Sequence, residues 1–212
     1  MEITKPRLDI ERLQDADALV PSGGEVSGVC LRNGSFAGIC REHMAVQESL
    51  FAGCLFTGAS ICRSQFSDVV FRNCDFSGAD LQGSSFHRVE FLQCRFSGTN
   101  LSDATLANVS LHDCKGEYVS FAEGRLRLVQ FSGSGLRGAV FDSCRFEGVE
   151  FVKCDLVEAD FSRTRLKGLS LADSDIRGLR VGEVTSLELK GLKVSRMQAV
   201  DLARLLGVEI EE

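Results

Sequence analysis

An apolar residue recurs at every fifth position of this chain from Phe51 to Val181, with one interruption at Gly116. All 15 phenylalanines lie on this register, which we call the ruler, although chance would place only about one in five there. An α-helix repeats its apolar face at spacings of three and four, and a β-strand at two. Neither accounts for a period of five, so the backbone must turn a corner in every unit.

The position two residues before each ruler residue holds a small or slender side chain, and we call this position the small slot. The residue types in the small slot repeat with a second period, of 20 residues. Leu169 and Leu179 are the only large residues in the slot. One series of slots holds Val69, Val89, Val109, Val129 and Val149, and another holds Cys54, Cys74, Cys94 and Cys114. A chain that closes one four-sided coil per 20 residues would stack these like residues, with successive coils paired as parallel strands about 4.8 Å apart. The sequence therefore predicts a four-sided β-solenoid.

The individual units also carry a recognisable motif. Four units resemble the repeats of the pentapeptide-repeat proteins especially clearly. They are CDFSG (Cys74 to Gly78), ADLQG (Ala79 to Gly83), CRFSG (Cys94 to Gly98) and CRFEG (Cys144 to Gly148). This resemblance implies an all-β fold, a right-handed quadrilateral parallel β-helix, with the phenylalanine or leucine and the small residue both pointing inward. The number of units gives about eight coils, followed by a C-terminal α-helix.

Two stretches resemble a narrower group. GSSFHRVEFLQCRFSGTNL (Gly83 to Leu101) and the tail LKVSRMQAVDLARLLGVEIEE (Leu192 to Glu212) are similar to the Qnr-type members found in Gram-positive bacteria. Those are DNA-mimicking proteins that bind DNA gyrase and topoisomerase IV and protect them from quinolones. The resemblance implies the same partners here and a homodimer formed through the C-terminal helix, with no direct binding of nucleic acid.

Three segments are expected from the patterning. Residues 1–25 lie outside the register and are predicted to cap the first coil, because an open solenoid end exposes unpaired strand edges. Residues 26–194 form the solenoid, within which 38–49 is expected to be a distorted coil or a surface loop. We expect a bulge at Gly116, with Tyr118 filling or covering the gap.

Residues 195–212 are predicted to form the C-terminal dimerisation helix and tail. Ser195 and Gln198 form a capping box, and Gly207 is placed to end the helix. The apolar share of this segment exceeds one buried stripe. We expect one side to cover the last coil and the other to meet a second copy, with a dimer interface of Met197, Val200, Leu202, Leu205 and Leu206. A helix that only caps a monomer is the alternative.

The nine cysteines are better explained as packing residues than as a disulfide or metal framework. Six of them occupy the small slot in place of alanine, serine or valine, and no C-x-x-C pair occurs. Cys30, Cys40 and Cys62 lie off the slot and are expected at the surface. The chain has neither an apolar run long enough to span a membrane nor an N-terminal signal, so we expect a soluble, cytoplasmic protein.

No catalytic constellation is evident, because every inward position is apolar or small and the three histidines are not at ligand or triad spacings. We therefore predict that the chain is not an enzyme and holds no metal or cofactor. Function is then expected on the outer surface. The chain has a net charge of −6, but residues 51–181 contain 16 acidic against 15 basic residues.

These charges fall unequally on the four sides. The side of Phe66, Phe86 and Phe146, the basic side, has a net charge of +4. The two most acidic sides, that of Phe51 and Phe71 and that of Ile61 and Leu81, have −2 each, and we call the second of these the acidic side. The acidic side is the predicted partner-binding surface, through Asp80, Asp103, Glu123, Asp142 and Asp160.

Three interpretations of this surface remain open. The carboxylates of the acidic side could take the place of DNA phosphates in a basic DNA-binding groove of a type II topoisomerase. The basic side, with Arg125, Arg145 and Arg165 at 20-residue spacing, could bind an acidic partner or nucleic acid. The charges could also be only a solvated surface, on a pentapeptide-repeat scaffold or interaction protein with another partner.

Overall fold

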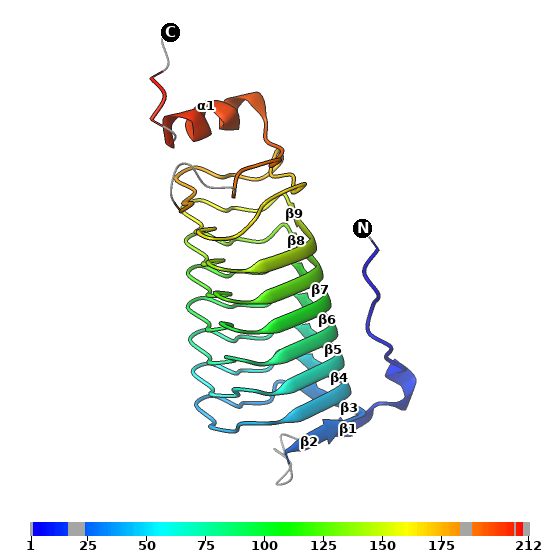
Figure 1. Cartoon of the computed structure of the whole chain (residues 1–212). Helices are drawn as coiled ribbons and strands as arrows, with labels where there is room; N and C mark the ends of the chain where they lie inside the picture. The colour runs from blue at the N-terminus through cyan, green and yellow to red at the C-terminus, as the bar shows by residue number, and fades with distance from the viewer. Residues whose placement is uncertain (1, 17–23, 183–187, 206, 210–212) are drawn as a thin grey trace.

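The computed structural model describes residues 2–16, 24–182, 188–205 and 207–209. A rod of stacked coils rises from the N-terminal strands to an α-helix at the far end (Figure 1). The elements in chain order are η1 (Ile10–Arg12), β1 (Gln14–Ala16), β2 (Glu25–Ser27), β3 (Val29–Arg32), β4 (Ala45–Ala52), β5 (Gln65–Arg72), β6 (Ser85–Leu92), β7 (Thr105–His112), β8 (Arg125–Ser132), β9 (Arg145–Val152) and α1 (Arg196–Leu205).

Strands β4 to β9 pair in parallel with a register of 20 residues. Phe66 lies beside Phe86, and Val69 beside Val89, as the second period of the sequence requires. These six strands have eight residues each. Isolated parallel bridges continue the repeat as far as Arg180. The predicted parallel β-solenoid with a C-terminal helix is confirmed.

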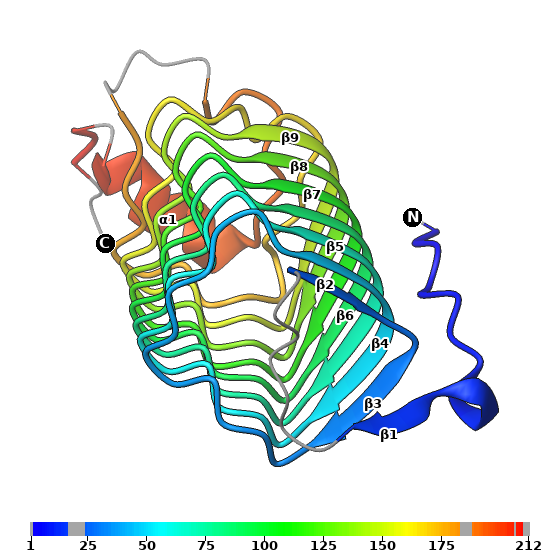
Figure 2. The same cartoon turned by 90° about the horizontal axis from the view of Figure 1, so that it is seen from below.

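Seen along its axis, the chain traces a four-sided outline (Figure 2). Each long strand bends at its centre and supplies two sides, and isolated bridges supply the other two. Every described non-glycine residue with positive φ lies two positions after a ruler position, as at Asp68 (φ 57°), Arg88 (φ 52°) and Asn108 (φ 56°). A left-handed residue costs roughly 1–2 kcal/mol when it has a Cβ. The corners are therefore held by pairing of the coils rather than by local preference.

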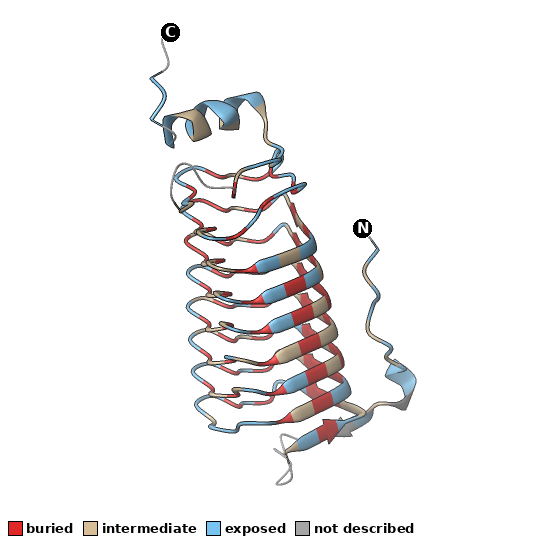
Figure 3. Cartoon of the chain, viewed as in Figure 1, coloured by how far each residue is buried: buried red, intermediate tan, exposed pale blue. Residues whose placement is uncertain are grey.

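The core is a thin column, visible as a buried interior stripe along every coil (Figure 3). Phenylalanine rings stack from coil to coil, with centroids 4.7 Å apart between Phe56 and Phe76 and 4.8 Å between Phe66 and Phe86. Val69, Val89, Val109 and Val129 fill the small slot without measurable exposure. Because like side chains stack, each coil completes the hydrophobic contacts of the one before it.

The slot cysteines act as small core residues. All nine cysteines are free thiols, and the six slot cysteines are buried. Their sulfurs donate weak hydrogen bonds to backbone carbonyls, as from Cys94 Sγ to the oxygen of Phe71 at 3.4 Å. Burial raises the pKa of Cys144 to about 12 and that of Cys154 to about 11, so both thiols are neutral and unreactive near pH 7.

The three cysteines off the slot differ from one another. Cys40 is exposed and Cys62 is partly buried, but Cys30 is buried, so the prediction that it lies at the surface is wrong. Cys30 belongs to β3, where it pairs with Leu50 of β4 and with Asp15 of β1. Because β3 lies between β1 and β4, Cys30 is not at an open edge of the sheet.

The expected bulge at Gly116 does not form. Lys115 bridges both Arg95 and Gly135 in the regular register. A Cβ on Gly116 would lie 3.1 Å from side-chain carbons of Leu136 and Val119, so these two residues fill the space that a ruler side chain would take. Tyr118 is 62% exposed and plays no part in the core.

Residues 38–49 likewise follow the coil. Arg41 and His43 donate backbone hydrogen bonds to the oxygens of Ser60 and Cys62, one coil further on. Arg41 is exposed although it occupies a ruler position, and Met44 is buried beside it. This segment is a regular coil with one outward-facing ruler residue.

The two ends of the chain are organised differently. At the N-terminal end β1 pairs with β3. Residues 2–10, which precede β1 in the chain, lie outside the solenoid beside the strands (Figures 1 and 2). At the other end residues 188–194 pair with the last coil through a bridge between Ser170 and Lys193. The predicted division into 1–25, 26–194 and 195–212 remains a prediction.

Candidate partner-binding surfaces

The described residues contain no group of histidine, cysteine or carboxylate side chains that could hold a metal ion. His43 is exposed, whereas His112 Nδ1 lies 2.5 Å from Ser132 Oγ. Burial, together with the charge of Arg88, lowers the pKa of His87, so its imidazole is neutral near pH 7. Among the described residues, no helix is long and apolar enough to cross a membrane.

The acidic side carries all five predicted partner-binding carboxylates, but their surroundings differ. Asp103 and Glu123 are exposed, lie one coil apart at the same corner, and form no ion pair with any described residue. Because the coils are parallel and in register, the two carboxylates repeat at the rise of the sheet, about 4.8 Å. They present a short column of negative charge to solvent.

The other three carboxylates are engaged within the chain. Asp80 accepts hydrogen bonds from the backbone N–H of Gln82 and from Asn100 Nδ2, at 3.1 and 2.9 Å. Asp160 accepts the backbone N–H of Ser162 at 2.9 Å. Asp142 forms an ion pair with Arg163. Asp80 and Asp160 keep their charge but are held in place by these hydrogen bonds, so Asp103 and Glu123 are the two carboxylates of this side that are exposed and without an ion pair among the described residues.

The helix α1 is held on the last coil by polar contacts at its N-terminus. The backbone N–H of Ser195 donates to Gln198 Oε1 at 2.7 Å and that of Gln198 to Ser195 Oγ at 3.3 Å, so the predicted capping box is confirmed. Gln198 Nε2 also donates to the carbonyl oxygens of Leu171 and Ser174, at 2.9 and 2.7 Å. Gly207, at φ 76°, follows the helix in the left-handed conformation of a C-terminal cap.

The predicted dimer residues do not all face the same way. Met197 is 79% exposed, and Val200 and Leu205 are 36% and 43% exposed. Leu202 is partly buried against the solenoid core, and Leu206 lies outside the described residues. The helix thus covers the coil with one side and leaves apolar side chains on another.

The sequence analysis did not predict that residues 2–10 contact the outer face of the strands. The backbone N–H of Arg7 donates to Asp68 Oδ1 at 2.9 Å, and that of Thr4 donates to Asn108 Oδ1 at 3.2 Å. Lys5, Pro6, Leu8 and Ile10 line a shared cavity with Leu50, Val70 and Leu92. The available signal was that these three strand residues are apolar at outward-facing positions, where the repeat otherwise favours polar side chains.

A rod of parallel coils with an apolar interior and functional groups only on its outside defines a protein that acts through its surface. Two patterns of the same family match the sequence, pentapeptide repeats over residues 49–88 and a pentapeptide repeat region over residues 84–161. Together they span more than half of the chain. The chain belongs to the pentapeptide-repeat family, and it is a structural or interaction protein rather than an enzyme.

Several solved structures are similar to the chain. QnrB1, described as a plasmid-mediated fluoroquinolone resistance protein, is 21% identical over 92% of this chain and 95% of its own, with a TM-score of 0.46. HetL, involved in heterocyst differentiation regulation in the cyanobacterium Nostoc, is 16% identical over 80% and 86% of the chains, with a TM-score of 0.26. A protein from the thylakoid lumen of Arabidopsis thaliana is 23% identical over 58% and 69%, with a TM-score of 0.32. No curated protein sequence matches the chain.

Proposed function

We propose that this chain is a DNA-mimicking cytoplasmic protein that binds a type II topoisomerase, DNA gyrase or topoisomerase IV, and protects it from quinolones. The observation that carries the proposal is the column of exposed carboxylates at Asp103 and Glu123, on a solenoid whose repeat fixes their spacing. The chain's net charge of −6 favours a basic partner surface. The resemblance of residues 83–101 and 192–212 to Qnr-type proteins supports the same partner.

The proposed contact depends on shape as well as charge. About eight coils at ~4.8 Å give a rod of roughly 40 Å, and two rods joined end to end give roughly 80 Å. A straight object of that length fits along a groove built for duplex DNA. The acidic side then faces the groove, where its carboxylates take the place of phosphates.

The dimer is part of the proposal. The described residues of α1 include none that is fully buried, and Met197, Val200 and Leu205 leave apolar surface at the end of the rod. A second helix packed there would remove this surface from water, which stabilises association. The two solenoids would then extend in opposite directions from the shared helices.

A gyrase supercoiling assay tests the proposal. Purified protein is titrated at one inhibitory quinolone concentration, and the series is repeated without the drug. We expect supercoiling to recover at low protein concentration and to be inhibited at high concentration, because a DNA mimic competes for the DNA site. If neither series responds to the protein, the alternative of a scaffold or interaction protein with another partner is favoured.

A further inference from the structure

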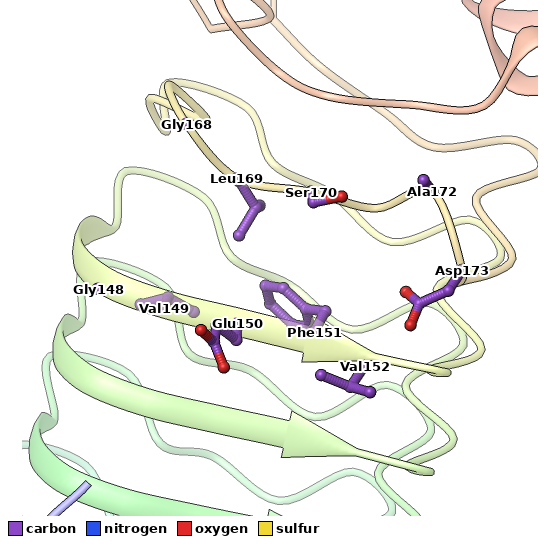
Figure 4. Close-up of a pocket in the computed structure, with 10 residues that line it drawn as sticks. All are labelled: Gly148, Val149, Glu150, Phe151, Val152, Gly168, Leu169, Ser170, Ala172 and Asp173. Carbon is purple, nitrogen blue, oxygen red and sulfur yellow. The ribbon is translucent and has the colours of Figure 1, made fainter. Parts of the chain in front are cut away.

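Among the described residues, the pairing of the solenoid is interrupted above β9. Every strand from β4 to β8 pairs with the next coil, but no backbone hydrogen bond joins residues 145–152 of β9 to residues 165–172. The coils remain linked at both ends of this gap, where the backbone N–H of Cys144 donates to Thr164 Oγ1 and that of Cys154 to Ser174 Oγ. A cleft of about 650 Å³ lies between β9 and residues 168–173 (Figure 4).

The opening coincides with a change in the sequence of the next coil. Leu169 occupies the slot that valine fills in the five coils before it, and its longer side chain is buried there. On their other side residues 166–171 pair with residues 188–193, as in the hydrogen bond from Leu171 to the oxygen of Lys193. The backbone edge of β9 is therefore left without a strand partner.

Phe146, at the start of β9, is changed by this opening. Fourteen of the fifteen phenylalanines are buried, whereas Phe146 is only partly buried. It lines two adjoining concavities of about 520 and 420 Å³, and Arg145 lines both as well. An aromatic ring accessible from two hollows is the kind of residue that anchors a protein partner.

The surroundings of Phe146 are positively charged. Arg125, Arg127 and Arg145 line the larger hollow together with one carboxylate, Glu147, and Arg145, Arg163 and Arg165 line the smaller one. Arg163 pairs with Asp142, but Arg125, Arg127, Arg145 and Arg165 are exposed and form no ion pair with any described residue. Guanidinium groups bind carboxylates through paired hydrogen bonds, which makes this surface complementary to acidic groups.

We propose that β9 and the hollows around Phe146 form a docking site for an acidic segment of a partner protein that carries an apolar anchor residue. The segment's carboxylates meet Arg125, Arg145 and Arg165, its apolar side chain covers Phe146, and its backbone can pair with the open edge of β9. A protein segment fits better than a nucleic acid, because only a peptide backbone has the N–H donors and carbonyl acceptors that pair with the open edge of a strand. Phe146 and the arginines of this site lie on the basic side, and the site does not depend on the proposed topoisomerase contact.

Fluorescence anisotropy with labelled synthetic peptides tests the docking site. The probe is an eight-residue peptide of alternating glutamate and leucine, matched to the length of β9. We expect saturable binding that weakens as salt rises, because exposed charges are screened. Peptides that alternate lysine with leucine, or glutamate with glycine, are expected to bind at least about tenfold more weakly, since each lacks one of the two complementary features.

Paired variants locate the site. Arg145→Glu with Arg165→Glu should weaken binding of the glutamate–leucine peptide about tenfold or more. The control, Arg95→Glu with Arg137→Glu, reverses two arginines on the opposite side and should leave binding unchanged. Phe146→Leu should weaken binding severalfold while keeping the fold, because leucine occupies the equivalent position at Leu106 and Leu126.

Three results would overturn the proposal. They are no saturable binding of the glutamate–leucine peptide, equal losses in the two arginine double variants, and tighter binding of a short DNA duplex than of that peptide. The last would identify nucleic acid as the ligand of the basic side. Circular dichroism of every variant establishes that each is folded before binding is compared.

Discussion

Asp68 and Arg88 face each other across two adjacent coils and hold the N-terminal segment against the strands. Arg88 Nε donates to Asp68 Oδ1 at 2.6 Å, and the same oxygen accepts the backbone N–H of Arg7. The two side chains are 10% and 17% exposed, so the ion pair is shielded from solvent. A contact between residues 61 positions apart in sequence thereby joins the segment to the rod.

Replacing Asp68 with asparagine tests this contact. Asp68→Asn leaves Arg88 without its counter-ion, and losing one partner of a buried pair costs about 3 kcal/mol. We expect a lower free energy of unfolding by thermal or denaturant melts, and faster proteolysis within residues 2–12. The control is Asp75→Asn, which breaks an exposed pair with Arg95 and should cost less than about 1 kcal/mol. Equal effects of the two substitutions would contradict the role assigned to Asp68.

The same pair predicts a dependence of stability on pH. Burial alone would raise the pKa of Asp68, but hydrogen bonds from Arg88 and from the Arg7 backbone outweigh it and lower that pKa below 3.8. A carboxyl with a lowered folded-state pKa contributes stability that is present above its unfolded pKa and is lost as pH falls through the folded pKa. We therefore expect the stability difference between the native chain and Asp68→Asn to be constant above about pH 5 and to shrink below pH 4. Melts across this range measure it, and a difference that grows on acidification would refute the assignment.

The Gly116 unit predicts an effect of overpacking. Because position 116 lies on the ruler, the repeat pattern alone would predict that a leucine there raises the stability of the chain. The structure predicts the reverse, because Val119 and Leu136 already fill the space and a Cβ would meet both at 3.1 Å. Gly116→Leu should destabilise the chain by about 1–3 kcal/mol. Leu126→Phe, at a ruler position already occupied by a large residue, is the control and should cost less; a stabilising Gly116→Leu would mean that the interior there is under-filled.

The sequence was enough to predict the solenoid because its two periods impose one geometry. A five-residue ruler requires corners, and the valine series at 20-residue spacing fixes the register that pairs Val69 with Val89 and Val109 with Val129. The capping box of Ser195 and Gln198 was equally predictable, since its residues are three apart. In each case the interaction is local or is repeated many times.

Single long-range contacts were not predictable in this way. Nothing in the repeat indicates that Asp142 would be neutralised by Arg163, because the pairing depends on side-chain direction at a corner. The filled space at Gly116 depends on two neighbours in different units. Leu169 was visible as a large residue in a small slot, but the open edge of β9 beside it appears only when the pairing of residues 165–172 is known.

The exposed apolar residues of α1 predict the site of dimerisation. Met197→Glu combined with Leu205→Glu places two charges on the uncovered side of the helix, where burial without a partner is costly. Light scattering after size exclusion should report a monomer, while far-UV circular dichroism remains that of the native solenoid. Arg196→Glu, which changes an exposed polar residue of the same helix, should stay dimeric. A double variant that remains a dimer would place the interface elsewhere.

Charge reversal on the acidic side tests the proposed topoisomerase contact most directly. Asp103→Lys with Glu123→Lys replaces the exposed carboxylate column with positive charge, so attraction to a basic groove becomes repulsion. In the gyrase assay we expect about tenfold more protein to be needed for protection, with a smaller loss at high salt because screening weakens the native attraction too. Glu117→Lys with Glu158→Lys reverses two exposed carboxylates on another side and serves as the matched control. If Arg125→Glu with Arg145→Glu impaired protection more than the acidic-side variant, the topoisomerase would instead contact the basic side.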